Sequence, residues 1–475
     1  MLTIQAMGIT LCVFLLYWFT LAPTVLWGDD AELQRLAFTG ESGSGLRNYP
    51  LWQLAARQIT RLPLGDIAKG ANLTSAIFAA LTIGVLFIAI KMLTDSQPAA
   101  WIGGLALGVS HTFWLHAVRA EVYTLFLFLL TAVITLLIWW RRKMSDWILA
   151  AAFFLAGIAL LAHPLILTAV PAMVVFVVSV KRNALRSYTL AAAALLLGIV
   201  PYLVINTSAT QSGFNVQAVA AGLWQVQVRD MMLWAGFLGY QFLILLPIGI
   251  LGFIQFGRTD RIYALFLALL FLGNVIFALS HRVPDQYVFY LPSYVVFALW
   301  VGMGAALIFD KGLLLIKQRL VLFALLLLAA GLPVLFYALT PRILNQFGVT
   351  LLAARDLPGR DNNLFFLYPP KNGYYGARDY GETVLRVLPP DAAVLADWLP
   401  LQTLLYLQQV EGLRPDVLLV EAHVGRGEQL PWLIEQSRTR PVFIADNERY
   451  YDMEEINQLF EVSSFGPIYK LLRKE

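Results

Sequence analysis

The stretch ANLTSAIFAALTIGVLFIAIKML, residues 71–93, decides the fold class of this chain. Lys91 is its only charged residue, and it lies near the end of the run. About 20 predominantly apolar residues are enough for a helix to cross the hydrocarbon core of a bilayer. The stretch therefore predicts a membrane-spanning helix.

Apolar runs of similar length recur on both sides of this stretch. We count about eleven before residue 340, each near the length that a spanning helix requires. They cover 4–26, 71–93, 98–116, 121–140, 146–162, 164–180, 187–205, 233–256, 262–280, 287–309 and 320–340. The pattern predicts an α-helical polytopic membrane protein whose transmembrane domain comprises residues 1–340.

The composition supports the same class. Of the 475 residues, 59% are hydrophobic and only 13% are charged, against about 25% charged in an average soluble domain. These values exclude a soluble enzyme, and they exclude a disordered chain, which would need few apolar residues and many charges. The net charge of +4 fits basic cytoplasmic loops, so we expect no nucleic-acid partner. The single cysteine excludes an intrachain disulfide.

Lys and Arg residues set the orientation, because cytoplasmic loops are enriched in both. The basic residues gather on alternate loops: Lys91, Arg141, Arg142, Lys143, Lys181, Arg182, Arg186, Arg258, Arg261, Lys311, Lys317 and Arg319. The opposite short loops hold only Arg119, Arg229 and Arg282. We therefore expect a cytoplasmic N-terminus in a plasma or inner membrane. The first long loop, residues 27–70, and the C-terminus then face the extracytoplasmic side.

The segment 341–475 has denser charges and shorter apolar runs. Residues 392–397, 416–422 and 441–446 are typical of buried strands, with helical stretches near 400–411 and 427–437 between them. This alternation predicts a small extracytoplasmic α/β domain with a parallel sheet. Asp397 and Asp446 end two of the strands, where open sheets tend to bind ligands. Helix capping explains them more simply.

The first outward loop opens with Trp27-Gly28-Asp29-Asp30-Ala31-Glu32-Leu33, which we call the acidic motif. In a helix that begins after Gly28, Asp29 and Glu32 would share a face. A carboxylate at the membrane surface can act as a general base toward a hydroxyl. Acidic residues also stabilise the N-terminus of a helix, here expected over 30–37. Both interpretations remain open from the spacing alone.

The rest of the loop predicts more than a connector. Residues 39–50 are rich in Gly and Ser and indicate a turn. Residues 51–64 have apolar positions at helical spacing, with Arg57 and Arg61 opposite. Such a helix suits the membrane interface, where it could serve a lipid-linked substrate. A helix that only covers the bundle is an equally good interpretation.

Polar residues occupy two further outward corners. The first corner holds His116, Arg119, Glu121 and Tyr123, and the second holds His281, Arg282, Asp285 and Tyr287. Charges near spans are usually paired or functional. The simpler prediction is that Arg119 and Glu121 neutralise each other. The functional prediction is that the acidic motif and the two corners line one cavity. Arg119 or Arg282 would then bind a phosphate bidentately in it.

Few other motifs for chemistry are present. The five histidines form no HxxxH pair, so we expect no histidine metal site, and His163 before Pro164 more simply caps or breaks a span. No Walker loop, dinucleotide fingerprint or Gly-x-Ser-x-Gly elbow occurs. An ATP-driven pump is therefore not expected.

Several of these stretches resemble one family of polytopic membrane proteins. APTVLWGDDAEL (22–33) is similar to the opening motif of the protein O-mannosyltransferase-related family, which belongs to the GT-C superfamily of glycosyltransferases. Asp29 and Glu32 match its two acids, whereas Asp30 and Ala31 replace the usual Ser and Gly. Further similar stretches are LPLGDIAKGANLTSAIFAAL (62–81), AEVYTL (120–125), DQYVFYLPSYVVFALWVGMG (285–304), LPPDAAVLADW (388–398) and QQVEGLRPDVLLVE (408–421).

The resemblance implies a transferase that takes a sugar from a polyprenyl-phosphate-linked donor in the bilayer. It implies inversion at the anomeric carbon, with Asp29 as general base, Glu32 beside it and no certain cofactor, although a divalent metal could assist. Donor and acceptor would bind at residues of the loop and of the two corners: Asp30, Arg47, Tyr49, His116, Arg119, Glu121, Tyr123, His281, Arg282, Asp285 and Tyr287.

The chain departs from the family pattern at one place. The family often has His-Pro-Pro-Gly-Tyr-Pro-Leu after the acidic motif, whereas residues 46–51 here read LRNYPL. A different substrate from that of usual members would follow if that His contacts donor or acceptor. The sugar is therefore not transferable from the family, and the acceptor could be a protein, a lipid or a glycan. The alternatives are a membrane transporter of a small or lipidic solute and a non-catalytic scaffold.

Overall fold

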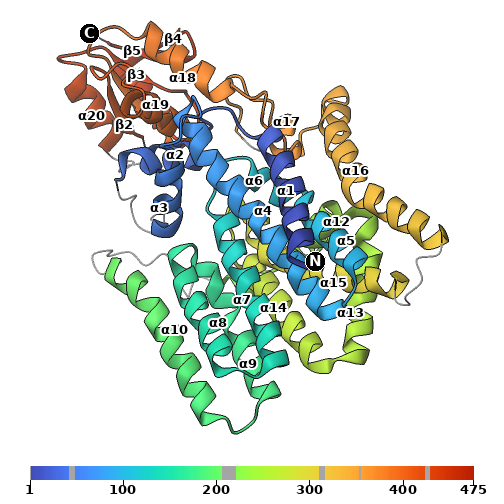
Figure 1. The fold of residues 1–475 in the computed structure, drawn as a ribbon. Helices are drawn as coiled ribbons and strands as arrows, with labels where there is room; N and C mark the ends of the chain where they lie inside the picture. The colour runs from blue at the N-terminus through green and yellow to red at the C-terminus, as the bar shows by residue number, and fades with distance from the viewer. Residues whose placement is uncertain are drawn as a thin grey trace.

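The computed structural model describes residues 2–41, 49–205, 221–309, 316–351, 355–422 and 428–474. Figure 1 shows a helical bundle with a small α/β body at one end, formed by the last part of the chain. We call residues 355–474 the tail. The N-terminal helix and the helices drawn in blue lead directly up to it.

Eight segments among the described residues are long and apolar enough to cross a membrane. They lie in α1 (Leu2–Thr20), α4 (Ile67–Thr94), α7 (Tyr123–Lys143), α10 (Leu185–Ile205), α12 with α13 (Val228–Thr259), α14 (Arg261–Ser280), η5 with α15 (Gln286–Phe309) and α16 (Ile316–Gln346). This architecture confirms the α-helical polytopic class. The count of about eleven spans stays a prediction.

The remaining apolar runs form shorter or broken helices. They comprise α5 (Gln97–Gly108), α6 (His111–Ala117), α8 (Asp146–Ile158), η2 (Ala159–Leu161), η3 (Pro164–Thr168) and α9 (Val170–Val180). Pro164 and Pro171 stand at helix starts, where a residue without an N–H is tolerated. His163 caps η3 by accepting the N–H of Leu165 at 3.1 Å, which confirms its predicted capping role.

Two span boundaries differ from the prediction. The first helix ends at Thr20 rather than near 26, and residues 21–28 run irregularly toward the acidic motif. The run 233–256 is divided by Leu243, whose φ of 45° ends α12 (Val228–Phe242) before η4 (Leu243–Leu245) and α13 (Leu246–Thr259). Such a φ is unfavourable for a side chain with a Cβ, so the helix cannot continue through it.

The first loop contains two helices. The helix α2 (Asp29–Thr39) begins within the acidic motif and matches the helix predicted over 30–37. The second, α3 (Pro50–Ile59), is shorter than the predicted 51–64 and buries Trp52 while Arg57 stays exposed. The long helix α4 then starts at Ile67, where the Asp66 side chain accepts the N–H of Ala68 at 2.8 Å.

The tail is an α/β body. Its elements are α17 (Asn362–Leu367), α18 (Gly376–Val387), β1 (Ala393–Ala396), α19 (Trp398–Gln409), β2 (Leu418–Glu421), α20 (Gln429–Gln436), β3 (Val442–Ile444), α21 (Met453–Leu459), β4 (Phe460–Phe465) and β5 (Ile468–Arg473). The sheet order is β2-β1-β3-β5-β4. The predicted strands β1, β2 and β3 are parallel, as expected. The antiparallel hairpin of β4 and β5 was not predicted.

The described residues form two hydrophobic cores, and Trp27 and Ala31 of the acidic motif belong to the second, whereas Leu33 belongs to the first. The larger core lies in the helical bundle. The tail core includes Val25, Trp27, Ala31 and Ala68 from the first loop and its flanks. A charged link reinforces this contact, because Arg378 of α18 donates to Asp66 at 2.9 Å. The tail is therefore packed onto the segment that carries the candidate catalytic acids.

Candidate active site

The turn before α2 is shaped by Gly28. Its φ is +58°, and a Cβ at this position would lie 2.7 Å from the side chain of Leu399 in α19. Only glycine adopts this conformation without strain and also leaves room for the neighbouring helix. The Gly28 N–H donates to the carbonyl of Leu399 at 3.3 Å. The motif therefore needs a glycine both for its own turn and for the contact with the tail.

The three acids of the motif have different surroundings. Asp29 is exposed, and its Oδ1 accepts a hydrogen bond from the Trp398 indole N–H at 2.7 Å. Asp30 and Glu32 are buried, with 4% and 5% exposure. All three lie in the first turn of α2, where the helix dipole favours negative charge. The three acids can therefore stabilise the helix N-terminus while Asp29 remains accessible for chemistry.

The Asp30 side chain points toward Arg119 of the first corner. Its Oδ2 lies 3.7 Å from a guanidinium nitrogen of Arg119, and both side chains are buried. Burial raises the pKa of Asp30 to about 7, although the charge of Arg119 opposes that rise. A neutral and a charged Asp30 are therefore both accessible near pH 7.

Arg119 sits between two carboxylates and a histidine. It donates to Glu121 Oε1 at 2.8 Å and to His116 Nε2 at 3.0 Å. Because His116 Nε2 then accepts, its Nδ1–H donates to the Thr112 carbonyl at 2.7 Å. Burial raises the pKa of Glu121 well above its usual value. We call Asp30, His116, Arg119 and Glu121 the Arg119 cluster, and it contains the predicted Arg119–Glu121 pair.

Two atoms of the Arg119 cluster lack a partner among the described residues. The Oδ1 of Asp30 and the Nε of Arg119 are both buried and make no hydrogen bond. A buried polar atom without a partner costs about 1–3 kcal/mol. One acceptor and one donor are thus left for a ligand that offers a hydroxyl and an anionic oxygen.

The second corner divides between two environments. Tyr287 lies with its ring 6.3 Å from that of His116, and Asp285 interacts electrostatically with Asp29 and Arg119. His281 packs against Phe289, with ring centroids 4.6 Å apart.

Arg282 does not join the Arg119 cluster. It is exposed, pairs with Asp230 at 3.0 Å and donates to the Gln225 carbonyl. The expectation that Arg282 shares the phosphate site is therefore not supported, because a surface ion pair holds its guanidinium outside the cluster.

Aromatic rings connect the loop with the first corner. Tyr49 stacks on His163 at 5.5 Å between ring centroids, with an angle of 13° between the planes. Tyr123 lies 5.1 Å from the same imidazole and 5.6 Å from that of His116. Arg47, the remaining candidate of the loop, lies outside the described residues.

The sequence did not reveal two residues that the tail brings to this region. Trp398 contacts Asp29, as described above, and Lys371 interacts electrostatically with Asp30 and Arg119. Lys371 is 2% exposed, and its Nζ donates to the carbonyls of Tyr368, Pro369 and Pro370. Among the described residues no carboxylate lies within 4 Å of this ammonium, and burial lowers its pKa. Trp398 ends the family-like stretch LPPDAAVLADW (388–398), but that stretch does not indicate a contact with Asp29, and Lys371 stands within no recognisable motif.

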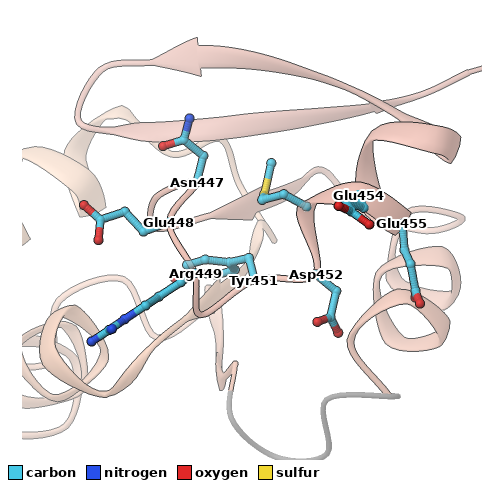
Figure 2. A pocket seen from close by; sticks show the side chains of 8 residues that line it. Asn447, Glu448, Arg449, Tyr451, Asp452, Glu454 and Glu455 are labelled. Atoms are coloured by element: carbon cyan, nitrogen blue, oxygen red, sulfur yellow. The ribbon is translucent and has the colours of Figure 1, made fainter.

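The ends of the tail strands are already occupied. Asp397 caps α19 by accepting the Leu399 N–H at 3.3 Å, as the capping interpretation predicted. Arg355 pairs with both Asp397 and Asp446, so an internal cation fills this edge. Figure 2 shows a nearby cavity of about 380 Å³, lined by residues between Asn447 and Glu455. It contains no residue of the Arg119 cluster.

A metal site is not evident in the part of the chain that the structure describes, where no three His, Cys, Asp or Glu side chains are placed to hold an ion. The question of a divalent metal at the acidic motif stays open to experiment.

Comparisons with known proteins agree with this architecture. Residues 48–187 match the family model of the protein O-mannosyl-transferase TMEM260 N-terminal domain. The crystal structure of ArnT from Cupriavidus metallidurans bound to undecaprenyl phosphate has 16% sequence identity and a TM-score of 0.61, with 98% of this chain and 97% of that chain covered. The crystal structure of ArnT from the same organism in the apo state has 13% sequence identity and a TM-score of 0.60, with the same coverage of both chains.

These matches confirm the predicted resemblance to O-mannosyltransferase-related proteins of the GT-C type. The structural likeness extends over nearly the whole chain and shows the fold, including the tail. Together the two findings show what this chain is similar to, in sequence over residues 48–187 and in fold over nearly its whole length.

Proposed function

We propose that this GT-C-type chain transfers a sugar from a polyprenyl-phosphate-linked donor to an acceptor hydroxyl on the extracytoplasmic side of the membrane, with inversion. One observation carries the proposal. The Arg119 cluster holds a buried cation with an unpaired N–H, and its buried Asp30 is next in sequence to the exposed Asp29 in α2, which packs against the tail helix α19. A phosphate and a hydroxyl are the two groups that this arrangement accommodates.

Asp29 is the general base of the proposed reaction. Its exposed position lets an acceptor approach from the aqueous side, and Trp398 engages only Oδ1. Asp29 takes the proton of the acceptor hydroxyl while the acceptor oxygen bonds to the anomeric carbon. The bond from that carbon to the phosphate oxygen breaks in the same step, and the lipid phosphate leaves with the electron pair. Asp29 then returns the proton to water.

The leaving phosphate requires positive charge in a site shielded from water. Arg119 supplies it, and a guanidinium binds phosphate oxygens bidentately. Asp30 and Glu121 hold Arg119 in place. Glu32, in the same helical turn as Asp29, adjusts the electrostatic surroundings of that base. Lys371 adds a second cation from the tail, because a buried ammonium without a carboxylate favours an anionic ligand.

Side chains around the Arg119 cluster complete the donor and acceptor sites. Tyr123 and Tyr287 lie with their rings next to that of His116, and Tyr49 stacks on His163. Aromatic rings offer flat apolar surfaces to ligands. In this proposal catalysis belongs mainly to the membrane part, residues 1–340, although α16 continues past the predicted boundary to Gln346, and the tail packs against the first loop.

The matched family makes mannose the first sugar to test and a Ser or Thr hydroxyl of a protein the first acceptor. ArnT bound to undecaprenyl phosphate suggests the lipid carrier for the assay. The altered stretch at residues 46–51 is the reason to include other undecaprenyl-phosphate monosaccharides and lipid or glycan acceptors in the panel.

The test uses purified protein in liposomes with undecaprenyl-phosphate mannose and Ser/Thr-rich peptides. Release of undecaprenyl phosphate together with glycosylated acceptor is the expected result, and Asp29→Asn should abolish most of it. A transporter would move the intact donor across the bilayer without cleaving it. Intact transport, or no cleavage of any donor in the panel, would contradict the proposal.

A further inference from the structure

The tail helix α19 lies directly on the acidic motif. Three hydrogen bonds join them: Trp398 Nε1–H to Asp29 Oδ1 at 2.7 Å, Gly28 N–H to the Leu399 carbonyl at 3.3 Å, and Thr403 Oγ1–H to the Leu26 carbonyl at 2.9 Å. The last two fix the backbone before and within the motif. The first reaches the side chain that we propose as the base.

The motif is also anchored from its other side. Trp27 is 3% exposed and donates its indole N–H to the Tyr374 hydroxyl at 2.6 Å. Its ring packs 5.2 Å from that of Tyr380 in α18. Backbone and side-chain contacts from two tail helices therefore leave the acidic turn little freedom to reorient.

Trp398 itself starts from a rigid point of the tail. It follows Asp397, which is 2% exposed, comes directly after β1 and caps α19. The Asp397 N–H donates to the Tyr451 hydroxyl at 3.0 Å, and that hydroxyl donates to Asp397 Oδ2 at 3.2 Å. Arg355 pairs with the same carboxylate. The carboxyl end of this strand, where a ligand might have been expected, instead fixes the base of α19.

We infer that Trp398 is a positioning residue for Asp29. Its indole N–H holds Oδ1, which fixes the carboxylate rotamer and directs Oδ2 toward the acceptor hydroxyl. This inference rests on the proposed function, and it assigns the tail a direct part in catalysis. Misplacement of a reacting group by about 1 Å can cost about 100-fold in rate, so loss of this bond should lower kcat and leave donor binding intact.

The decisive variant is Trp398→Phe, which keeps an aromatic ring and removes the donor. We expect kcat for undecaprenyl-phosphate mannose to fall about 10–100-fold, with the KM for the donor and the affinity for undecaprenyl phosphate near wild type. Trp432→Phe, in α20 of the same tail, is the matched control and should retain kcat. Trp398→His keeps a ring N–H and should recover part of the rate.

A double variant separates positioning from a general structural role. Once Asp29→Asn has removed the base, adding Trp398→Phe should cause no further loss. An additional loss equal to that of the single change would show that Trp398 acts elsewhere. Wild-type kcat in Trp398→Phe would overturn the inference. So would loss of undecaprenyl phosphate binding or of folding in both Trp398 variants, because a structural role would then explain the effect.

A readout without turnover distinguishes this inference from the proposed function. The exposed Asp29 carboxyl can be amidated with a carbodiimide and glycinamide, and the extent measured by peptide mass spectrometry. Trp398→Phe should change the labelling rate at Asp29, whereas Trp432→Phe should not. If the wild-type protein cleaves no donor but labelling changes, the proposed function fails and the positioning contact stands. Unchanged labelling at Asp29 would refute the contact itself.

Discussion

Arg119 and Arg282 lie on two corners that look equivalent in the sequence, yet their side chains differ in burial and in partners. Arg119 is 7% exposed and is enclosed by Asp30, Glu121 and His116. Arg282 is exposed and is paired, among the carboxylates of the described residues, with Asp230. An exposed ion pair is screened by water and contributes little, whereas a buried cation acts strongly on any charge that develops beside it. Burial thus separates a candidate site from a surface contact.

The sharpest test of this comparison removes one carboxylate that interacts with each arginine. Asp29→Asn should lower donor turnover by about 10²–10⁴-fold, the usual contribution of general-base catalysis. Asp230→Asn, which strips Arg282 of its partner, should leave turnover near wild type, and Glu32→Gln should fall between them. Turnover is measured in liposomes at matched protein levels. Equal activity of the Asp29 and Asp230 variants would leave the acids of the motif as helix-stabilising residues only.

The arginines themselves give the second test. Arg119→Gln should weaken binding of undecaprenyl phosphate about 10–100-fold, since a hydrogen bond to a charged group contributes about 1.5–3 kcal/mol. Arg282→Gln should change it by less than about twofold. Undecaprenol, which lacks the phosphate, should bind all variants alike. Because removal of Arg119 leaves two buried carboxylates, thermal unfolding must show that the variant is folded. Equal affinities of the two variants for undecaprenyl phosphate would show that burial does not distinguish Arg119 from Arg282 as a phosphate ligand.

Lys371 extends the same reasoning to the tail. Lys371→Met keeps the length of the side chain and removes the buried charge, so binding of undecaprenyl phosphate should fall about tenfold. The melting temperature should stay equal or rise, because replacing a buried charge that lacks a carboxylate by an apolar chain is often neutral or stabilising. Lower stability with unchanged affinity would mean that the ammonium serves only the three carbonyls around it.

The smallest effect concerns pH. The pKa of Asp30 lies near 7, above its usual 3.8, so the folded protein favours the protonated form. That contribution to stability is present below about pH 4 and is lost as the pH rises toward 7. Ionised Asp30 also competes with a phosphate for Arg119.

Affinity for undecaprenyl phosphate should therefore decline a few-fold as the pH rises through about 7. Asp30→Asn should flatten this dependence, and Asp230→Asn should retain it. A binding titration between pH 5.5 and 8.5 measures both slopes. The same slope in wild type and Asp30→Asn would assign the titration to another group.

Much of the fold followed from local patterns. Long apolar runs specify spanning helices because each must satisfy its own backbone hydrogen bonds in lipid, and the three parallel strands of the tail are short, buried runs. The hairpin of β4 and β5 escaped prediction because residues 460–473 place charged and polar side chains among the apolar ones. Broken spans such as α5 and α6 were predicted as one because composition does not reveal where a helix is interrupted.

The site was predictable only where its residues lie close together in the chain. The acidic motif and the first corner were found because several polar residues follow one another beside apolar runs. Trp398 and Lys371 lie more than 300 residues after the acidic motif, and although Trp398 ends the family-like stretch 388–398, that stretch does not indicate a contact with the acids. Arg282 carried the same signal as Arg119, since charge pattern does not report which side chain becomes buried.

The core shared by the acidic motif and the tail joins residues that are synthesised at different times. Val25, Trp27 and Ala31 leave the ribosome first, whereas the tail residues that cover them are made last. Until the tail is made, these side chains lack the partners that bury them in the complete structure. A ribosome that stops after α16 would release a chain with every residue of the motif and the Arg119 cluster, inserted in the bilayer but inactive. On the proposed function, activity then depends on completion of the polypeptide.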